Sequence, residues 1–330
     1  MKRLLIVVVA AALLWSGYWA LGAMGAKRGL ENWMEARRAE GWQADYAEFS
    51  LRGYPNRFDA LWQNLALADP GTGLAVEMPR FGLYALSWKP GHLIAVWPER
   101  FDFRTPEERF SLASEDLRAS LRVTPGPLLE LQRAQMTGRA LVLSGGTEAA
   151  MDSLNLAMAQ DAEDDSRYRL GLAAEGLSLP APLAARLAVE GLPEAVTELR
   201  LDADVTFTRP WDLRALEEAR PQPERVALHL ARAAWGDLLL QVTADLEVDA
   251  QGRLSGEAHV QARQWRQMLQ MAVAAGALPA EVAGSLEQGL SLMAGFSGNP
   301  NSLDLGLTLH DGTIWAGLIP LGPAPVLHLR

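Results

Sequence analysis

The chain has 330 residues, a formal net charge of −10 and no cysteine. Its 40 acidic residues outnumber its 30 Lys and Arg residues, which excludes general binding to nucleic-acid backbones because such binding needs a basic surface. The cysteine count excludes disulfides, thiolate nucleophiles and zinc–thiolate sites, and it fits an oxidising compartment.

Residues 4–25 form an uncharged and mostly apolar run. As a helix rising 1.5 Å per residue, this run is roughly 30 Å long, about the thickness of the hydrocarbon core of a bilayer. Basic residues flank it on both sides: Lys2, Arg3, Lys27 and Arg28. The sequence therefore predicts that residues 1–26 are a membrane anchor.

A cleaved secretory signal is the alternative for the same segment. Such a signal has a basic start, an apolar core of about 7–15 residues and a small-x-small cleavage site, which Ala20, Leu21 and Gly22 would supply. The apolar run is long for a signal core, so we predict an uncleaved signal-anchor. A buried helix of a soluble protein is disfavoured, because so many contiguous apolar residues at an N-terminus would be exposed.

The flanking charges support two orientations of the anchor. Lys and Arg near the ends of a span favour the cytoplasmic side, and those after the run would keep the body in the cytoplasm: Lys27, Arg28, Arg37 and Arg38. A short N-terminal segment with two basic residues is the usual layout of a bacterial signal-anchor that exports the remainder of its chain. We therefore predict a single-pass inner-membrane protein with its body in the periplasm.

Residues 27–41 continue the pattern as a juxtamembrane helix. Leu30, Trp33 and Met34 fall on one face, and Gly41 is placed to end the helix. We expect the apolar face to pack on the body rather than on lipid.

From residue 42 the apolar period changes from 3.6 to 2, which predicts a β-rich body over residues 42–330. Within residues 58–67 the alternation changes face before Leu65, which indicates a bulge. Turns are expected at residues 69–71 and 89–91. Other strands are expected at residues 42–51, 74–78, 93–97, 110–114, 117–123, 139–143, 153–159, 168–174, 199–207, 225–233, 238–248, 253–261, 303–309 and 313–318.

A few helices interrupt the strands. They are expected at residues 182–189, at residues 211–220 and, as two consecutive helices, within residues 263–294. Prolines after the middle helix make residues 208–224 the best candidate for a seam between two halves. Residues 319–325 carry too many prolines for a central strand and are expected to form an extended edge or tail.

The predicted fold class is α+β: a transmembrane helix, then an elongated, curved, mostly antiparallel β-sheet body with a few packed helices. A sheet with one apolar face needs a cover, and the predicted helices can cover only part of it. The remaining face would close on itself or stay open as an apolar trough.

The sequence nominates no catalytic, cofactor-binding or metal-binding residue. The histidines are scattered singly and lack i, i+4 spacing: His92, His229, His259, His310 and His328. The acidic run 161–165 lacks the glycine and terminal glutamate of a calcium loop, so we interpret it as a solvated hairpin tip. No cofactor is predicted, and an enzyme would need a site that the sequence does not reveal.

Residues 52–59, Arg-Gly-Tyr-Pro-Asn-Arg-Phe-Asp, form the most distinctive local motif. Its glycine permits a positive φ and its proline fixes the bend. We interpret the motif as a strand crossover that tucks Tyr54 and Phe58 into the core while Arg57 pairs with Asp59 or a neighbour. A binding role is the alternative.

The anchor, this motif and the closing segment together resemble a family of uncharacterised alphaproteobacterial envelope proteins, catalogued as a domain of unknown function. The motif matches at Gly53, Tyr54, Pro55, Arg57, Phe58 and Asp59, with Asn56 where an aromatic is expected. The closing segment matches at Asp311, Gly312 and residues 319–325 and departs at Ala316 and Leu318. The resemblance implies no catalytic residues.

Residues 238–275 are also similar, in their order of sheet, turn and helix, to AsmA-like proteins. Those are membrane-tethered periplasmic proteins implicated in envelope lipid transport, so this resemblance implies a related architecture.

Three classes of function remain open. The first is a non-enzymatic envelope protein of the inner membrane that binds phospholipid in the apolar trough or assists its transfer. The second is a structural scaffold that binds other envelope proteins without a small ligand, and the third is an enzyme. Co-purifying phospholipid, a stoichiometric protein partner or a reachable cluster of polar groups with perturbed pKa would distinguish them.

Overall fold

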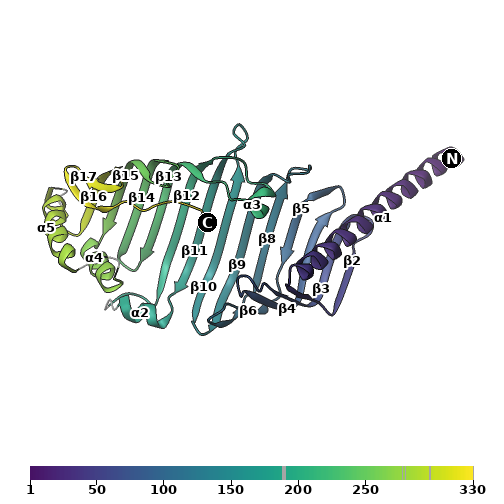
Figure 1. Ribbon diagram of the computed structural model, residues 1–330, viewed down its shortest axis with the longest axis horizontal. Helices are drawn as coiled ribbons and strands as arrows, with labels where there is room; N and C mark the ends of the chain where they lie inside the picture. The colour runs from purple at the N-terminus through teal and green to yellow at the C-terminus, as the bar shows by residue number, and fades with distance from the viewer. Residues whose placement is uncertain (188–190, 277, 279, 297–298, 330) are drawn as a thin grey trace. The chain divides into compact units, whose positions relative to one another are not determined.

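The computed structural model of the chain describes residues 1–187, 191–276, 278, 280–296 and 299–329. It is 21% helical and 52% strand. A long apolar helix at the N-terminus is followed by an antiparallel sheet of 18 strands with a few helices (Figure 1). The predicted α+β class is confirmed at this level.

The helices are α1 (Lys2–Ala39), α2 (Ala181–Leu187), α3 (Arg214–Glu217), α4 (Trp265–Ala274) and α5 (Ala280–Phe296). The first nine strands are β1 (Gln43–Asp45), β2 (Glu48–Arg52), β3 (Arg57–Ala68), β4 (Ala75–Leu86), β5 (Lys89–Val96), β6 (Arg100–Arg104), β7 (Arg109–Ala113), β8 (Asp116–Val123) and β9 (Leu131–Gly145). The others are β10 (Ala149–Gln160), β11 (Arg167–Ser178), β12 (Ala195–Phe207), β13 (Pro223–Trp235), β14 (Leu238–Val248), β15 (Leu254–Arg263), β16 (Ser302–His310), β17 (Thr313–Ala316) and β18 (Ile319–Pro323).

The chain divides into two compact units. The first comprises Met1–Val123 and Leu141–Gly146, and the second comprises Thr124–Ala140 and Thr147–Arg330. Residues 208–224, where the sequence suggests a seam, lie within the second unit.

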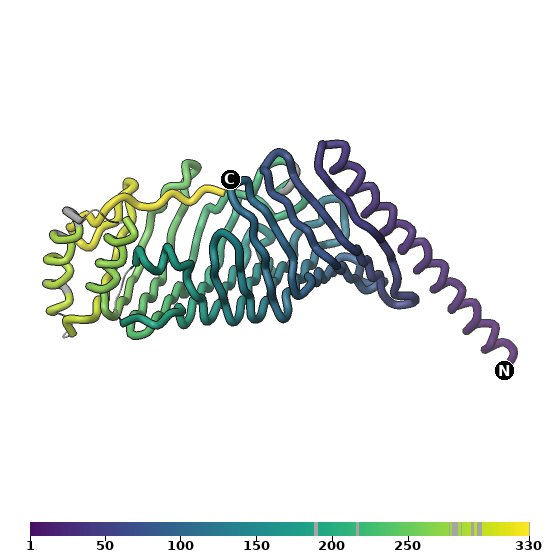
Figure 2. Tube along the Cα trace, turned by 90° about the horizontal axis from the view of Figure 1, so that it is seen from below, coloured from purple at the N-terminus to yellow at the C-terminus, as the bar shows by residue number. Residues whose placement is uncertain are grey.

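α1 is one uninterrupted helix of 38 residues, so the predicted anchor and juxtamembrane helix form a single element. The helix stops before Gly41, whose φ of 89° is the left-handed conformation typical of helix ends. Its N-terminal end extends clear of the strands as far as residue 14, and the remainder of the helix runs beside them (Figures 1 and 2). Leu30 and Met34 pack into the core of the first unit, whereas Trp33 is 47% exposed.

The core of the first unit is built on β3. Its buried hydrophobic positions alternate through Phe58, Ala60 and Trp62 and then resume at Leu65. Asn64 lies between the two sets with φ 50°, which gives the backbone the twist that the predicted change of face requires. The pairing of β3 with β4 has the same register on both sides of this point, so the change of face occurs without the register shift of the predicted bulge.

The turn expected at residues 89–91 lies two residues earlier. Leu86 pairs with Lys89, so Ser87 and Trp88 make the turn and β5 already begins at Lys89. The reason is tertiary: the Ser87 N–H donates to the Asn56 carbonyl at 3.0 Å, and Ser87 is fully buried. A contact with the 52–59 motif therefore places the turn, and the proline and glycine do not.

The second unit contains a meander in which β10 to β16 pair with consecutive neighbours. One face of it buries Tyr168, Ala203, Val205 and Phe207, and another cluster gathers Trp265 with Ala294 and Leu303. The two predicted helices within 263–294 are present as α4 and α5. Met268, Leu269 and Leu290 pack as expected, while the side chains of Val282 and Met293 lie outside the described part.

The helix predicted at 211–220 is much shorter, because only Arg214–Glu217 is helical. The Trp211 carbonyl accepts the Leu131 N–H, and the Leu213 N–H donates to the Leu128 carbonyl. These tertiary hydrogen bonds occupy backbone groups that a longer helix would need. The helix predicted at 182–189 is α2, which covers residues 181–187; residues 188–189 lie outside the described residues.

The proline-rich end of the chain forms an edge rather than a central strand. β17 ends at Ala316, earlier than the predicted 318, and β18 returns against it from Ile319 to Pro323 with an irregular register. An extended edge was the sequence-based expectation for residues 319–325.

Candidate functional site

An apolar hollow of the first unit lies between α1 and the strands β2 to β5. The helix contributes one face of side chains, spaced four, four, three and one residue apart: Tyr18, Gly22, Ala26, Gly29 and Leu30. Gly22, Ala26 and Gly29 have little or no side chain, so space remains between the helix and the sheet.

The sheet supplies the opposite wall. It consists of Leu51, Phe58, Ala60, Leu83, Tyr84, Ala85, Pro90 and Leu93. The hollow is partly open to solvent and has a volume of about 460 Å³, and none of the residues that line it is charged. We call this space the helix–sheet cavity. This hollow lies between α1 and the strands, so it differs from the trough predicted from the sequence, which was a face of the sheet without a helical cover.

Hydrogen bonds from the helix aromatics hold α1 over the sheet. The Trp15 Nε1–H donates to the Pro55 carbonyl at 3.1 Å, and the Trp19 Nε1–H donates to the Arg57 carbonyl at 2.9 Å. The Tyr18 hydroxyl donates to the Ser87 carbonyl at 2.6 Å. The helix is therefore positioned by backbone carbonyls of two adjacent turns and of the first residue of β3.

The distinctive 52–59 motif is the docking surface for this helix. Tyr54 packs edge-on against Trp19 at 5.3 Å between ring centroids, and its hydroxyl shares a 2.8 Å hydrogen bond with Ser16. Phe58 lies beneath Gly22, where an added Cβ would approach the ring to 2.7 Å. The glycine is needed at this position because the helix and the ring come so close.

The predicted roles of the motif residues are partly confirmed. Phe58 is buried, and Arg57 pairs with Asp59 at 2.6 Å, as expected. The expectation for Tyr54 is wrong: its side chain is 59% exposed, because its ring covers the outer side of α1 instead of entering the core.

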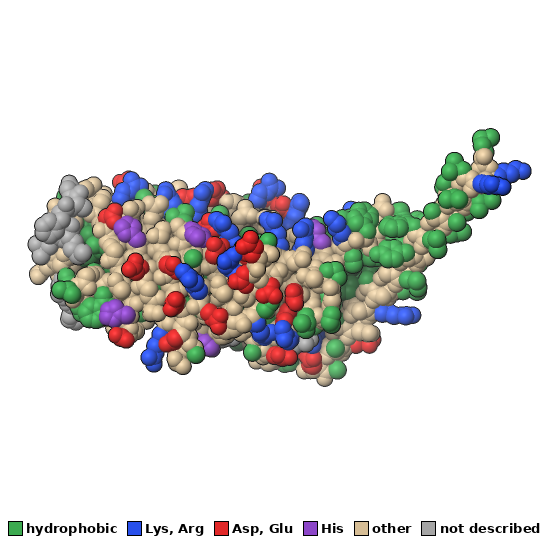
Figure 3. Space-filling view, turned by 90° about the horizontal axis from the view of Figure 1, so that it is seen from above, with side chains coloured by type: hydrophobic (Ala, Val, Ile, Leu, Met, Phe, Trp, Pro, Cys, Tyr) green, Lys and Arg blue, Asp and Glu red, His purple; other side chains and the backbone are tan. Residues whose placement is uncertain are grey.

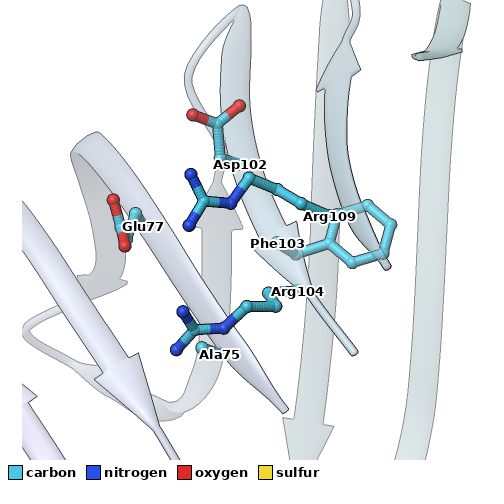
Figure 4. A pocket seen from close by; sticks show the side chains of 6 residues that line it. All are labelled: Ala75, Glu77, Asp102, Phe103, Arg104 and Arg109. Atoms are coloured by element: carbon cyan, nitrogen blue, oxygen red, sulfur yellow. The ribbon is translucent and has the colours of Figure 1, made fainter. Parts of the chain in front are cut away.

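A second, polar hollow lies at the other end of β4, where β4 is joined by β6 and β7. Its lining includes Glu77, Asp102, Arg104 and Arg109, whose charged groups surround a space of only about 20 Å³ (Figure 4). That volume accommodates about one water molecule. The two carboxylates and two guanidinium groups therefore form a solvated charge cluster. The space between them is too small for an organic substrate.

The acidic run 161–165 forms the tip of the hairpin between β10 and β11. The Asp161 carboxylate accepts the Glu163 N–H at 2.9 Å and an ion pair from Arg167 at 2.9 Å. These contacts, the backbone hydrogen bond first, lower the pKa of Asp161. The Ser166 hydroxyl similarly lowers the pKa of Asp164. The carboxylates are thus used to cap the turn, which agrees with a solvated hairpin tip.

The histidines remain separate in the fold. His229 lies 2.8 Å from Asp204, His259 lies 2.7 Å from Asp304, and His92 lies 2.9 Å from the Ser120 hydroxyl. Among the described residues, no group of three or more His, Cys, Asp or Glu side chains could hold a metal ion.

The residues of the helix–sheet cavity were not nominated from the sequence. A signal was present, because Gly22, Ala26 and Gly29 fall on one face of the predicted helix. That stripe does not by itself reveal an apolar wall opposite, since the wall comes from four separate strands whose lining residues run from Leu51 to Leu93.

Comparison with known proteins identifies one family. The model described as an uncharacterized protein conserved in bacteria (DUF2125) matches residues 19–325. No curated protein and no solved structure gives a significant match to the chain. The matched range contains both the 52–59 motif and most of the helix–sheet cavity.

Proposed function

The chain belongs to DUF2125, a bacterial family of uncharacterized proteins, and from that premise we propose that it is a membrane-anchored, non-enzymatic envelope protein that holds a phospholipid acyl chain in the helix–sheet cavity. The proposal places α1 across the inner membrane, the body in the periplasm, and the protein in the handling of envelope lipids. The sequence resemblance of residues 238–275 to AsmA-like proteins is the motive for assigning this role in lipid handling.

The course of the cavity along α1 is the observation that carries the proposal. α1 is the one described helix that is long and apolar enough to span a membrane. The cavity begins at Tyr18, within the apolar run, and reaches Leu30, beyond the basic residues that close the run. Twelve residues of helix correspond to about 18 Å. An uncharged path therefore leads from the depth of the bilayer past its surface.

The size and lining of the cavity fit an alkyl segment. Ligand pockets are typically about 300–1,000 Å³, and about 460 Å³ is available here. Each methylene group transferred from water to such a lining contributes about 0.8 kcal/mol. A single acyl chain gains substantially from this transfer, while the charged headgroup would stay outside.

The experiment uses two glycines of α1 as a matched pair. At both Gly29 and Gly25 an added Cβ meets nothing within 4 Å, but only Gly29 lines the cavity. We expect Gly29→Phe to fill the cavity and to reduce co-purifying phospholipid at least fivefold in native mass spectra of the detergent-extracted protein. Gly25→Phe should retain lipid as the parent chain does.

Two outcomes would contradict the proposal. Either the parent chain carries no lipid after gentle extraction, or Gly29→Phe and Gly25→Phe retain it equally. In that case the scaffold class gains support, and a stoichiometric envelope protein recovered with the full chain would establish it.

A further inference from the structure

The free part of α1 is too short to cross a bilayer. Residues 1–14 are exposed, and the first contact with the sheet is made by Trp15. Residues 4–14 therefore supply about 16 Å of unobstructed apolar helix, roughly half of the 30 Å hydrocarbon thickness. The remaining half has to come from residues that the body already covers on one side.

The span cannot move along the helix to avoid this overlap. A shift toward the C-terminus would bury Lys27 and Arg28, and Glu31 follows one turn later; charged groups at the centre of a bilayer are costly. A shift toward the N-terminus is limited by Lys2 and Arg3. The segment of α1 that docks on the body is therefore part of the membrane-crossing segment.

Two adjacent turns of the first unit meet α1 at this level. We call them the membrane rim, which consists of residues 53–56 and 87–89. The Ser87 N–H donates to the Asn56 carbonyl at 3.0 Å, so the two turns are joined. From these facts we propose that the membrane rim is immersed in the leaflet of the bilayer on the side of the body.

The composition of the membrane rim fits a membrane–water interface. Tyr54 and Trp88 are 59% and 49% exposed, and such half-exposed aromatics are typical of the headgroup region. Arg52 and Lys89 are exposed beside them, whereas residues 52–57 and 86–91 contain no acidic residue. Their basic ends can reach the phosphates while the aromatic rings lie deeper.

Hydrophobic side chains also continue from the helix onto the body. In the space-filling view they gather along α1 and on the neighbouring strands, whereas charges of both signs are scattered over the rest of that face (Figure 3). We infer that the bilayer covers this surface, because the membrane rim is docked on the same helix that enters the membrane.

The absence of cysteine in the chain allows a direct test. Asn56→Cys and Lys89→Cys place a single thiol on each turn at exposed positions. Glu107→Cys is the control: Gly73 at the far ends of β3 and β4 lies against Pro106, and a strand of 12 residues separates those ends from the membrane rim by roughly 35 Å. Each full-length variant is labelled with an environment-sensitive fluorophore and reconstituted in phospholipid nanodiscs.

We expect nitroxide lipids to quench the labels at positions 56 and 89 at least twofold more than the label at 107. Aqueous iodide should give the reverse order. Leu13→Cys, inside the free helix, confirms insertion in each preparation. If positions 56 and 89 are quenched by lipid no more than position 107, the membrane rim lies outside the bilayer and the inference fails. The inference rests on the proposed membrane-spanning role of α1, which the Leu13 label checks separately. It does not depend on a ligand in the cavity, so the lipid-retention experiment can fail without it.

Discussion

Tyr168 is a large side chain of the second unit that is fully buried. Its hydroxyl accepts the Trp211 N–H at 3.0 Å and the Gln160 Nε2–H at 3.3 Å. Burial, the main cause, raises the pKa of Tyr168, so the phenol stays neutral at physiological pH. It holds the segment before α3 against the sheet.

We expect Tyr168→Phe to destabilise the protein by about 1 kcal/mol, because the backbone N–H of Trp211 loses its acceptor inside the fold. Thermal unfolding of the detergent-solubilised protein should show a decrease in Tm of about 2–4 °C. Tyr46→Phe, which keeps its edge-on packing against Phe49, is the comparison and should change Tm by less. An equal effect of both substitutions would contradict the assigned role of the Tyr168 hydroxyl.

At the scale of elements, the docking of α1 decides whether the cavity exists. Trp15, Tyr18 and Trp19 each donate to a backbone carbonyl of the membrane rim or of the adjoining strand. Aromatic residues in the second half of an apolar span usually indicate the membrane interface. In this protein the same residues also fasten the helix to the body.

We expect the double substitution Trp15→Phe and Trp19→Phe to loosen α1, since both indole N–H donors are removed while the rings remain. Each lost hydrogen bond costs about 1 kcal/mol. Hydrogen–deuterium exchange of the protein in nanodiscs should then become faster in residues 53–57 and at Ser87. Trp33→Phe, on an exposed part of the same helix, should leave that exchange unchanged; faster exchange in it as well would indicate a general loss of stability.

At the scale of the whole molecule, paired carboxylates make stability depend on pH. The pKa of Asp212 is lowered chiefly by the hydrogen bond from Arg214, and the pKa of Asp202 by that from Arg169. The folded pKa of each group thus lies below its unfolded value of 3.8. Both groups contribute stability above that value, and the contribution is lost as the pH falls through the folded pKa.

Asp212→Asn tests this dependence at the most buried of these carboxylates. The Asp212 side chain is completely inaccessible, and it accepts hydrogen bonds from Arg214 Nε at 2.9 Å and Arg209 Nη1 at 3.3 Å. We expect the substitution to cost roughly 2 kcal/mol at pH 7 and to reduce the difference in Tm between pH 7 and pH 3. Asp245→Asn, at an exposed pair with Arg225, should have a much smaller effect. A pH dependence unaffected by Asp212→Asn would contradict this assignment.

Much of the fold could be predicted because its signals are local. An apolar run at residues 4–25 meets the length of a membrane span whatever surrounds it. The strand β14 was predicted at 238–248 and is found at Leu238–Val248. Successive side chains of a strand point to opposite faces of the sheet, so an apolar period of two in the sequence indicates a strand directly. Net charge and the lack of cysteine are likewise properties of the sequence alone.

The helix–sheet cavity and the docking role of the 52–59 motif were decided by tertiary structure. Three contacts form only when α1 lies across β2 to β5: Gly22 with Phe58, Tyr18 with Ser87, and Trp15 with Pro55. The turn at Ser87 and the shortened α3 shifted for the same reason, because their backbone groups bond to distant partners. A local pattern records which side of an element avoids water, but it does not record which surface will cover that side. That choice depends on the packing of segments far apart in the chain, and here it left space beside α1.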